Sequence, residues 1–119
     1  NSAIGYNSLG ANTTGGGNAA SGRKALQLNT TGAENTAMGA TALASNTTAS
    51  YNTAVGFRSL YLNTTGTQNT AVGFESLKAH TTSNDCVAVG LLALIMLLLV
   101  MPLSMLAQLQ IILVWVLNL

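Results

Sequence analysis

The sequence predicts an all-β fold, a parallel β-roll or β-solenoid of 17-residue coils, followed by an apolar C-terminal segment that is expected to be helical. Three observations lead to this prediction. The phrase Asn-Thr-Ala-Val-Gly-Phe occurs at 52–57 and again at 69–74. Looser copies of the same unit begin at residues 1, 18, 35 and 86 without any insertion. Each of the first five units also contains a polar turn, usually spelled Asn-Thr-Thr.

Positions within a coil are numbered here from 1 to 17, starting at residues 1, 18, 35, 52, 69 and 86. Position 3 is always alanine, position 5 always glycine and position 9 always leucine. A short strand is predicted over positions 2 to 4, a bend at position 5, a second short strand around positions 6 to 9, and then a polar turn. The bend requires glycine because its backbone tolerates positive φ. These turn glycines are Gly5, Gly22, Gly39, Gly56, Gly73 and Gly90.

Two positions supply the predicted core, the leucine at position 9 and the apolar residue at position 4. The predicted core residues are Leu9, Leu26, Leu43, Leu60, Leu77, Val55, Val72 and Val89. Because side chains alternate along a strand, the alanines at position 3 are then expected on an outer face, where chains would pack together. Stacking in register would also let the asparagines at position 12 hydrogen-bond in a ladder.

The small number of charged and potentially reactive residues argues against nucleic-acid binding, catalysis and metal binding. Only 6% of the residues are charged, and the seven charges are scattered along the sequence with a net charge of +1, so no basic stripe for nucleic acid is visible. Cys86 is the one cysteine and has no partner for an internal disulfide. His80 stands where other coils have asparagine, which favours simple substitution over a role in catalysis. We expect no enzyme activity, no metal site and no cofactor.

The chain divides into a repeat domain, residues 1–90, and an apolar tail, residues 91–119. All but five of the 29 tail residues are apolar, which is enough for a membrane-spanning helix. Leucine favours helix, and Pro102 is expected to kink it. The alternative is a frameshift: the codons of the repeat, read one base out of frame, encode Leu, Ile, Met and Val, as in Met96–Val100. Both explanations of residues 95–119 remain open.

The phrases Asn52-Thr-Ala-Val-Gly56 and Asp85-Cys-Val-Ala-Val-Gly90, with the recurring Asn-Thr-Thr-Gly turn, resemble the head repeats of YadA-like trimeric autotransporter adhesins. They are also similar to related repeats of phage and viral tail-fibre proteins. The resemblance implies a parallel β-roll, usually trimeric, displayed on a cell or virion surface and used for attachment. The period is longer than the usual one of adhesin heads, and the tail is not their β-strand anchor.

We therefore expect a structural or adhesive surface module, a head or fibre segment that forms a homo-oligomer and binds a host receptor or glycan. An extracellular, cell-surface or virion location follows from the same resemblance. Two alternatives are a membrane-anchored surface protein with an authentic tail and a solenoid that binds ice or glycan through outward threonines at positions 13 and 14. Adjacent threonines point to opposite faces of a strand, which would leave only one row outside.

Overall fold

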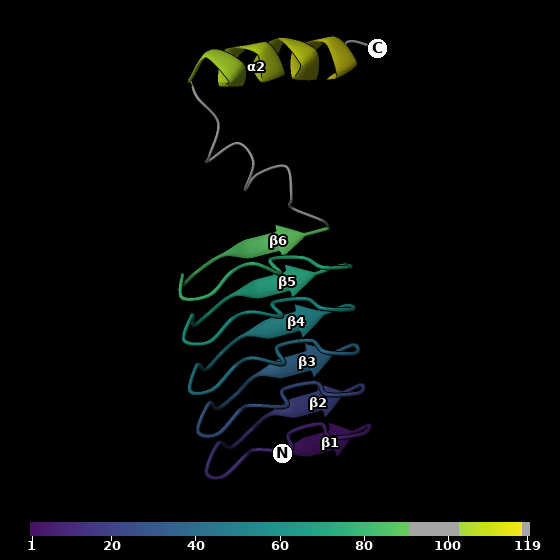
Figure 1. The fold of residues 1–119 in the computed structure, drawn as a ribbon, viewed down its shortest axis with the longest axis vertical. Coiled ribbons are helices and arrows are strands. Elements are labelled where there is room, and N and C mark those ends of the chain that lie inside the picture. Colours follow the sequence, from purple (N-terminus) through teal and green to yellow (C-terminus); the bar gives the residue numbers. More distant parts are fainter. Residues whose placement is uncertain (91–102, 118–119) are drawn as a thin grey trace.

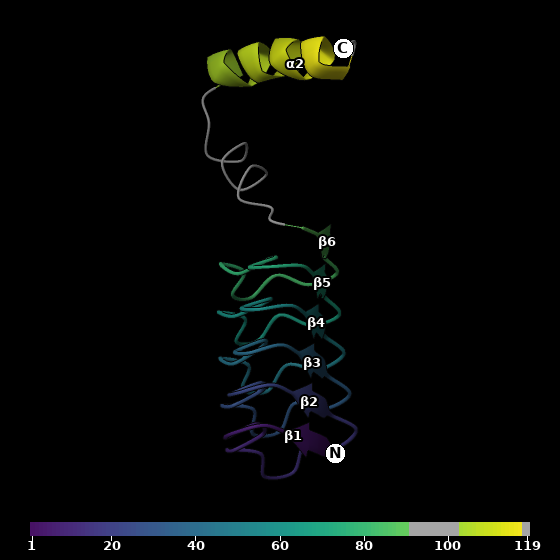
Figure 2. The same cartoon turned by 90° about the vertical axis from the view of Figure 1, so that its right-hand side faces the viewer.

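The computed structural model describes residues 1–90, which form a β-solenoid, and residues 103–117, which form a helix. Six short strands lie one above another in a single parallel sheet (Figures 1 and 2). Their bounds are β1 Ser2–Ile4, β2 Ala19–Ser21, β3 Thr36–Met38, β4 Thr53–Val55, β5 Thr70–Val72 and β6 Val87–Val89. Each strand occupies positions 2 to 4 of its coil, as the repeat predicts.

The register between strands follows the repeat without a slip. Ala37 pairs with Ala54, and Ala54 pairs in turn with Ala71. Each pairing joins residues that hold the same position in successive coils, so equal coil length places like residues above one another. The chain is thus a β-solenoid in which one row of side chains corresponds to one position of the repeat.

The prediction of a second strand at positions 6 to 9 is wrong. These residues form turns, in which Lys24 and Leu26 have φ values of 62° and 51°. The same two positions are left-handed in each of the first five coils. The turns bring neighbouring residues to the same side, so that Ala25 and Leu26 are both fully buried. A strand could not do this, because successive side chains point to opposite faces.

Although positions 5 to 13 lie outside the strand, many of their amides still pair between coils. The N–H of Gly22 donates to the carbonyl of Ile4 in the coil below at 2.8 Å, whereas the N–H of Leu26 donates to Ala42 in the coil above at 3.0 Å. Thr30 N–H similarly donates to Thr47 at 2.8 Å. Backbone pairing therefore continues around much of the coil and satisfies groups that turns would otherwise expose.

Alanine and leucine, rather than valine and leucine, form the core. Leu26, Leu43 and Leu60 are 0% exposed, and Leu9 and Leu77 pack against the buried cluster at its two ends. The position-3 alanines point inward as well: Ala37, Ala54 and Ala71 are also 0% exposed. The expectation that these alanines form an outer packing face is therefore wrong.

Since position 3 points inward, positions 2 and 4 must point outward, and the predicted valine core is wrong. Val89 is 76% exposed, Val72 is 37% exposed and Val55 is partly exposed. The reason is the small volume inside each coil. The interior of a coil is already filled by one leucine and the small residues at positions 3 and 8, so the larger side chain of the strand faces outward.

The position-5 glycines occupy a conformation that other residues rarely adopt. Gly39 has φ of 137°, and a Cβ atom on it would lie 2.5 Å from the carbonyl oxygen of Gly56 in the next coil. All six predicted turn glycines have positive φ. They permit both the bend and the close approach of successive coils.

Two ladders of buried asparagine join the coils, at positions 12 and 1. In the first, Asn46 donates from Nδ2 to Oδ1 of Asn29 at 2.8 Å and to the carbonyl of Ala49 at 2.9 Å. In the second, Oδ1 of Asn35 accepts from the backbone N–H of Asn52 at 3.0 Å. The predicted ladder at position 12 is thus present, and the ladder at position 1 was not expected. Both satisfy polar groups inside a narrow core.

Helix α2 spans Leu103–Leu117 and carries no charged residue in its first or last turn. It confirms the helical prediction for this part of the tail. Residues 91–102, including the predicted kink at Pro102, and residues 118–119 lie outside the described residues. Among the helices that the structure describes, none has the length and apolar character needed to span a membrane.

Candidate interaction surface

The outward face of the parallel sheet carries a row of threonine beside a row of apolar residues. Thr36, Thr53 and Thr70 lie at position 2 and are partly exposed. Position 4 follows two residues later on the same face and is occupied by Met38, 49% exposed, and by Val55, Val72 and Val89. Stacked strands lie about 4.8 Å apart, so each row is continuous along the solenoid axis. The result is a flat apolar stripe beside a row of hydroxyl groups.

An aromatic pair extends this apolar surface around the bend. Phe57 and Phe74, both at position 6, stack with their ring centroids 5.5 Å apart and an interplanar angle of 18°. They remain 40% and 60% exposed. Tyr6 holds the same position in the first coil and is 75% exposed. Large exposed side chains of this kind, two residues after the apolar stripe in each coil, are typical of a surface that meets a partner.

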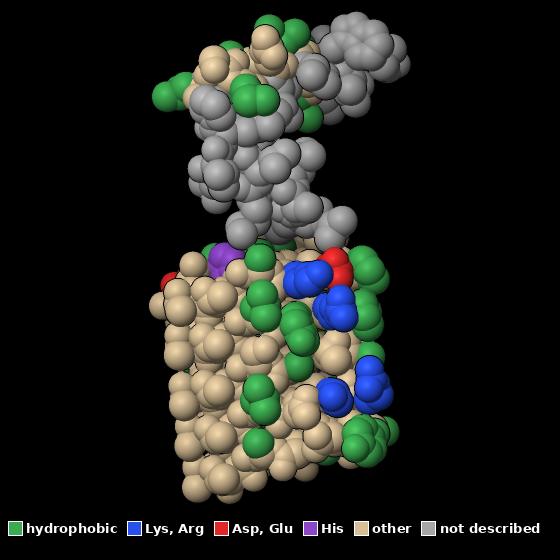
Figure 3. Space-filling model, in the orientation of Figure 1, with side chains coloured by type: hydrophobic (Ala, Val, Ile, Leu, Met, Phe, Trp, Pro, Cys, Tyr) green, Lys and Arg blue, Asp and Glu red, His purple; other side chains and the backbone are tan. Residues whose placement is uncertain are grey.

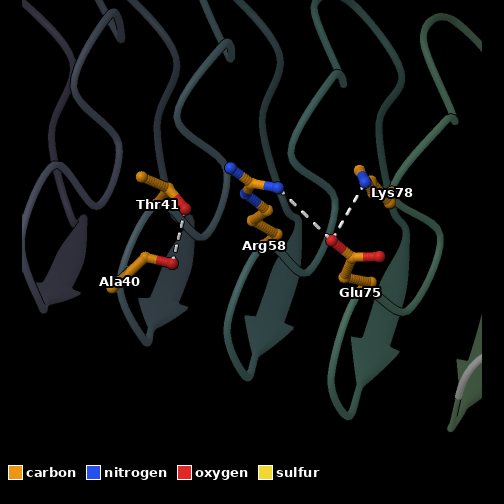
Figure 4. A network of polar contacts seen from close by, with 5 residues as sticks. All are labelled: Ala40, Thr41, Arg58, Glu75 and Lys78. Carbon is orange, nitrogen blue, oxygen red and sulfur yellow. Dashed lines mark hydrogen bonds and ion pairs between the residues drawn. The ribbon is translucent and has the colours of Figure 1, made fainter.

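Three charged side chains, those of Arg58, Glu75 and Lys78, form a small group on two neighbouring coils (Figure 4). Glu75 Oε1 lies 2.9 Å from Nζ of Lys78 and 3.5 Å from the guanidinium of Arg58. The Arg58 guanidinium also lies 5.0 Å from the ring centre of Phe57 and 5.6 Å from that of Tyr61. The hydrogen bond from Lys78 is the main reason that the pKa of Glu75 is held below its ordinary value, although partial desolvation opposes this shift.

The two threonine rows of the polar turn differ in their environment. At position 13, Thr30 Oγ1 donates to the carbonyl of Thr47 at 3.0 Å, and the same bond recurs from coil to coil. At position 14, the threonines are all exposed: Thr14, Thr31, Thr48, Thr65 and Thr82. The position-14 hydroxyl groups thus form one regular exposed row, although these residues lie in a bend and not in the strand that the alternation argument assumed.

The top described coil places His80 beside Cys86, a pair that the sequence did not bring together. Nε2 of His80 lies 3.1 Å from Sγ of Cys86. No hydrogen bond joins His80 to Ser83 or Asp85 within the described residues, and those residues contain no cluster of three metal-ligating side chains. His80 and Cys86 occupy positions 12 and 1 and replace the asparagines at the upper ends of the two ladders, although the backbone N–H of Cys86 still donates to Oδ1 of Asn69 at 3.0 Å.

Sequence reasoning missed the outward face because it assigned the valines to the core. A signal for the correct orientation was present in the sequence. Position 3 is invariant alanine, whereas position 4 varies among Ile4, Ser21, Met38 and valine. A close-packed interior tolerates little change in volume, so the position of constant size is the better candidate for the interior. Searches against protein-family models, curated proteins and solved structures found no match for this chain.

Proposed function

We propose that this chain is a structural and adhesive module of a surface fibre or head, in which copies associate side by side to form a trimer. The observation that carries the proposal is the flat stripe formed by Met38, Val55 and Val72 with the neighbouring phenylalanines. It runs along the outside of a solenoid whose own core is thin. Burying this stripe between chains would add apolar area that the single chain lacks, at about 25 cal/mol per Å².

The module is proposed to act through its outer surface rather than by chemistry. Its rows repeat along one axis, and a rigid repeat of this kind suits an extended contact with a cell surface or glycan. An extracellular, cell-surface or virion location belongs to the same proposal, as does the absence of an enzyme activity. The resemblance to adhesin heads and tail fibres supports the choice of attachment over other passive roles.

Association through the stripe can be tested by sedimentation velocity on the full chain. We expect a trimer for the unchanged protein and a monomer for the double variant Val55→Asp, Val72→Asp. The matched control is Thr65→Asp, Thr82→Asp, which adds the same charge in the same two coils but on the exposed position-14 row. The control retains the apolar tail and should remain trimeric. A monomeric unchanged chain, or association lost equally in both variants, contradicts the proposed interface.

Attachment can be tested separately with beads coated with the purified chain. Coated beads should adhere to cultured cells or to matrix-coated glass under flow more strongly than albumin-coated beads. Beads carrying the chain after heat denaturation provide the control for stickiness of the apolar tail. Equal retention of native and denatured coats would refute an adhesive function.

A second candidate function is ice binding through the exposed position-14 threonines. The observation in its favour is that five threonines form one outward row in register. The full chain would then show thermal hysteresis, and Thr48→Lys with Thr65→Lys would remove it. A freezing assay without hysteresis in the unchanged chain eliminates this candidate.

A further inference from the structure

All of the basic side chains of this protein lie along one edge of the solenoid. Arg23 is at position 6, Lys24 and Arg58 are at position 7, and Lys78 is at position 10. They come from three different coils, but positions 6 to 10 form the same turn in each of the first five coils, immediately after the bend. Figure 3 shows all the basic side chains on one side of the viewed face, beside exposed apolar residues. We call these four residues the basic edge.

The acidic side chains are distributed differently. Glu34 and Asp85 lie at position 17, which precedes the strand, whereas the basic edge follows it. Glu75 is the one acid among the turn residues of the basic edge, and it contacts both Lys78 and Arg58. Four cations therefore face one carboxylate on this edge, so it keeps a net positive charge although the whole chain is nearly neutral. The charge is separated across the width of the sheet.

Several of these cations are positioned for contact with a ligand. Arg23 is exposed, Lys24 is partly exposed, and the side chain of Arg58 is 43% exposed although it is held between aromatic rings. Lys24 and Arg58 stand at the same position two coils apart, a separation of roughly 10 Å along the axis if coils rise by about 4.8 Å. The edge thus offers positive charges at wide intervals along a straight line.

We propose that the basic edge binds an anionic polysaccharide, with the sugar chain lying along the solenoid axis. Sulfate or carboxylate groups on such a chain are separated by whole sugar rings, which suits widely spaced cations. Duplex DNA instead carries one charge per about 1.7 Å of its axis, far denser than this edge can neutralise. The inference rests on the proposed attachment function and names the class of ligand that the surface would recognise.

The test uses the full chain and immobilised heparin as the sulfated polysaccharide. Lys24→Gln should weaken binding about two- to fivefold at low salt, as expected for one exposed charge pair, and the affinity should become less sensitive to salt. The double variant Arg23→Gln, Lys24→Gln should weaken heparin binding more than Lys24→Gln alone does. The matched control is Gln68→Glu, which lowers the net charge by the same one unit at position 17, where Glu34 already shows that glutamate is accommodated.

Three results would overturn the inference. They are equal losses in Lys24→Gln and Gln68→Glu, binding that does not weaken as salt rises, or tighter binding to a duplex DNA oligonucleotide than to heparin. The chain should not bind to immobilised neutral dextran. Failure of this inference can be distinguished from failure of the proposed function. A trimeric, adhesive chain that does not bind heparin rejects only the role of the basic edge, and a heparin-binding chain that fails the bead assay rejects only attachment.

Discussion

At the scale of single residues, the position-5 glycines combine two constraints that act through the backbone. Gly56 has φ of 127°, and a Cβ atom there would lie 2.4 Å from the carbonyl oxygen of Gly73. An added methyl group therefore meets rigid backbone of the next coil and also requires a conformation that L-residues avoid. Neither conflict can be relieved by a rotamer change, because the clashing atoms belong to two stacked main chains.

Gly56→Ala is expected to lower the free energy of unfolding by about 2 to 4 kcal/mol, in the range of severe single substitutions. Gly16→Ala is the control, since a Cβ on Gly16 meets nothing within 4 Å and its φ is not positive. The control should stay within about 0.5 kcal/mol of the unchanged chain. Urea denaturation followed by circular dichroism measures both. Equal stability of the two variants would show that the coils do not approach as closely as described.

Glu75 gives a residue-scale prediction in which pH is the variable. Its pKa in the folded chain is lowered from an ordinary value of 4.5, first by the hydrogen bond from Lys78. The ionised carboxylate therefore stabilises the fold above the unfolded-state pKa, and this contribution is lost as pH falls through the lower folded-state pKa. The difference in Tm between the unchanged chain and Glu75→Gln should shrink between about pH 6 and about pH 3. A difference that grows on acidification would mean that the pKa is raised instead.

At the scale of the coil, the sequence predicts the period, the strand at positions 2 to 4, the bend and the position-12 ladder. Hydrophobicity alone assigns the wrong side of the strand to the interior, because valine is more apolar than alanine but the limiting quantity is the volume inside the coil; the constant alanine at position 3 is the signal for the correct side. The sequence does not predict turns over positions 6 to 9, since leucine rarely adopts positive φ by itself. Leu26 and Leu43 adopt φ near 50° because hydrogen bonds to neighbouring coils fix the turn around them.

The position-12 ladder ends at a defined residue, and this end yields the next prediction. Oδ1 of each asparagine accepts from the asparagine of the coil above, as Asn46 accepts from Asn63 at 3.1 Å. Above Asn63 stands His80, and Oδ1 of Asn63 is buried without a hydrogen-bond partner among the described residues. An unsatisfied buried acceptor of this kind costs about 1 to 3 kcal/mol.

His80→Asn should therefore extend the ladder, with Nδ2 donating to Asn63 and to the carbonyl of Ser83. The expected gain is about 1 kcal/mol in the free energy of unfolding. His80→Ala is the matched control, because it also removes the contact with Cys86 but supplies no donor. If both variants change stability alike, loss of the histidine rather than completion of the ladder explains the effect. Thermal denaturation of the three chains under one condition makes the comparison.

At the scale of the whole molecule, the arrangement of surface residues depends on the repeat more than on local sequence. Charges that look scattered along the chain gather on one edge because three different coils place positions 6 to 10 at the same corner. The valines form a stripe for the same reason. Each row is visible in the sequence when one position is compared across all coils, but only once it is known which positions face outward. That information depends on how much volume the interior of a coil can hold.

Because the surface and core rows depend on equal coil length, the repeat also predicts how the solenoid responds to the deletion of residues. Removing residues 35–51 takes out one whole coil and joins position 17 of the coil below to position 1 of the coil above. Asn29 would then meet Asn63, and Leu26 would meet Leu60, so both rows stay continuous. Since repeat arrays are stabilised by nearest-neighbour contacts, the fold should survive with a loss of about 1 to 3 kcal/mol, in proportion to the residues removed.

Removing residues 35–50 is the matched control, because it deletes one residue fewer and leaves Tyr51 as an eighteenth residue in the coil below the junction. The coil that receives the extra residue would place polar groups in the core and interrupt both asparagine ladders. We expect this variant to unfold or aggregate, while the whole-coil deletion keeps the circular dichroism spectrum of the solenoid. Equal tolerance of the two deletions would mean that coil length does not fix the stacking. The chain would then be held together by local turns rather than by residues aligned through the stack.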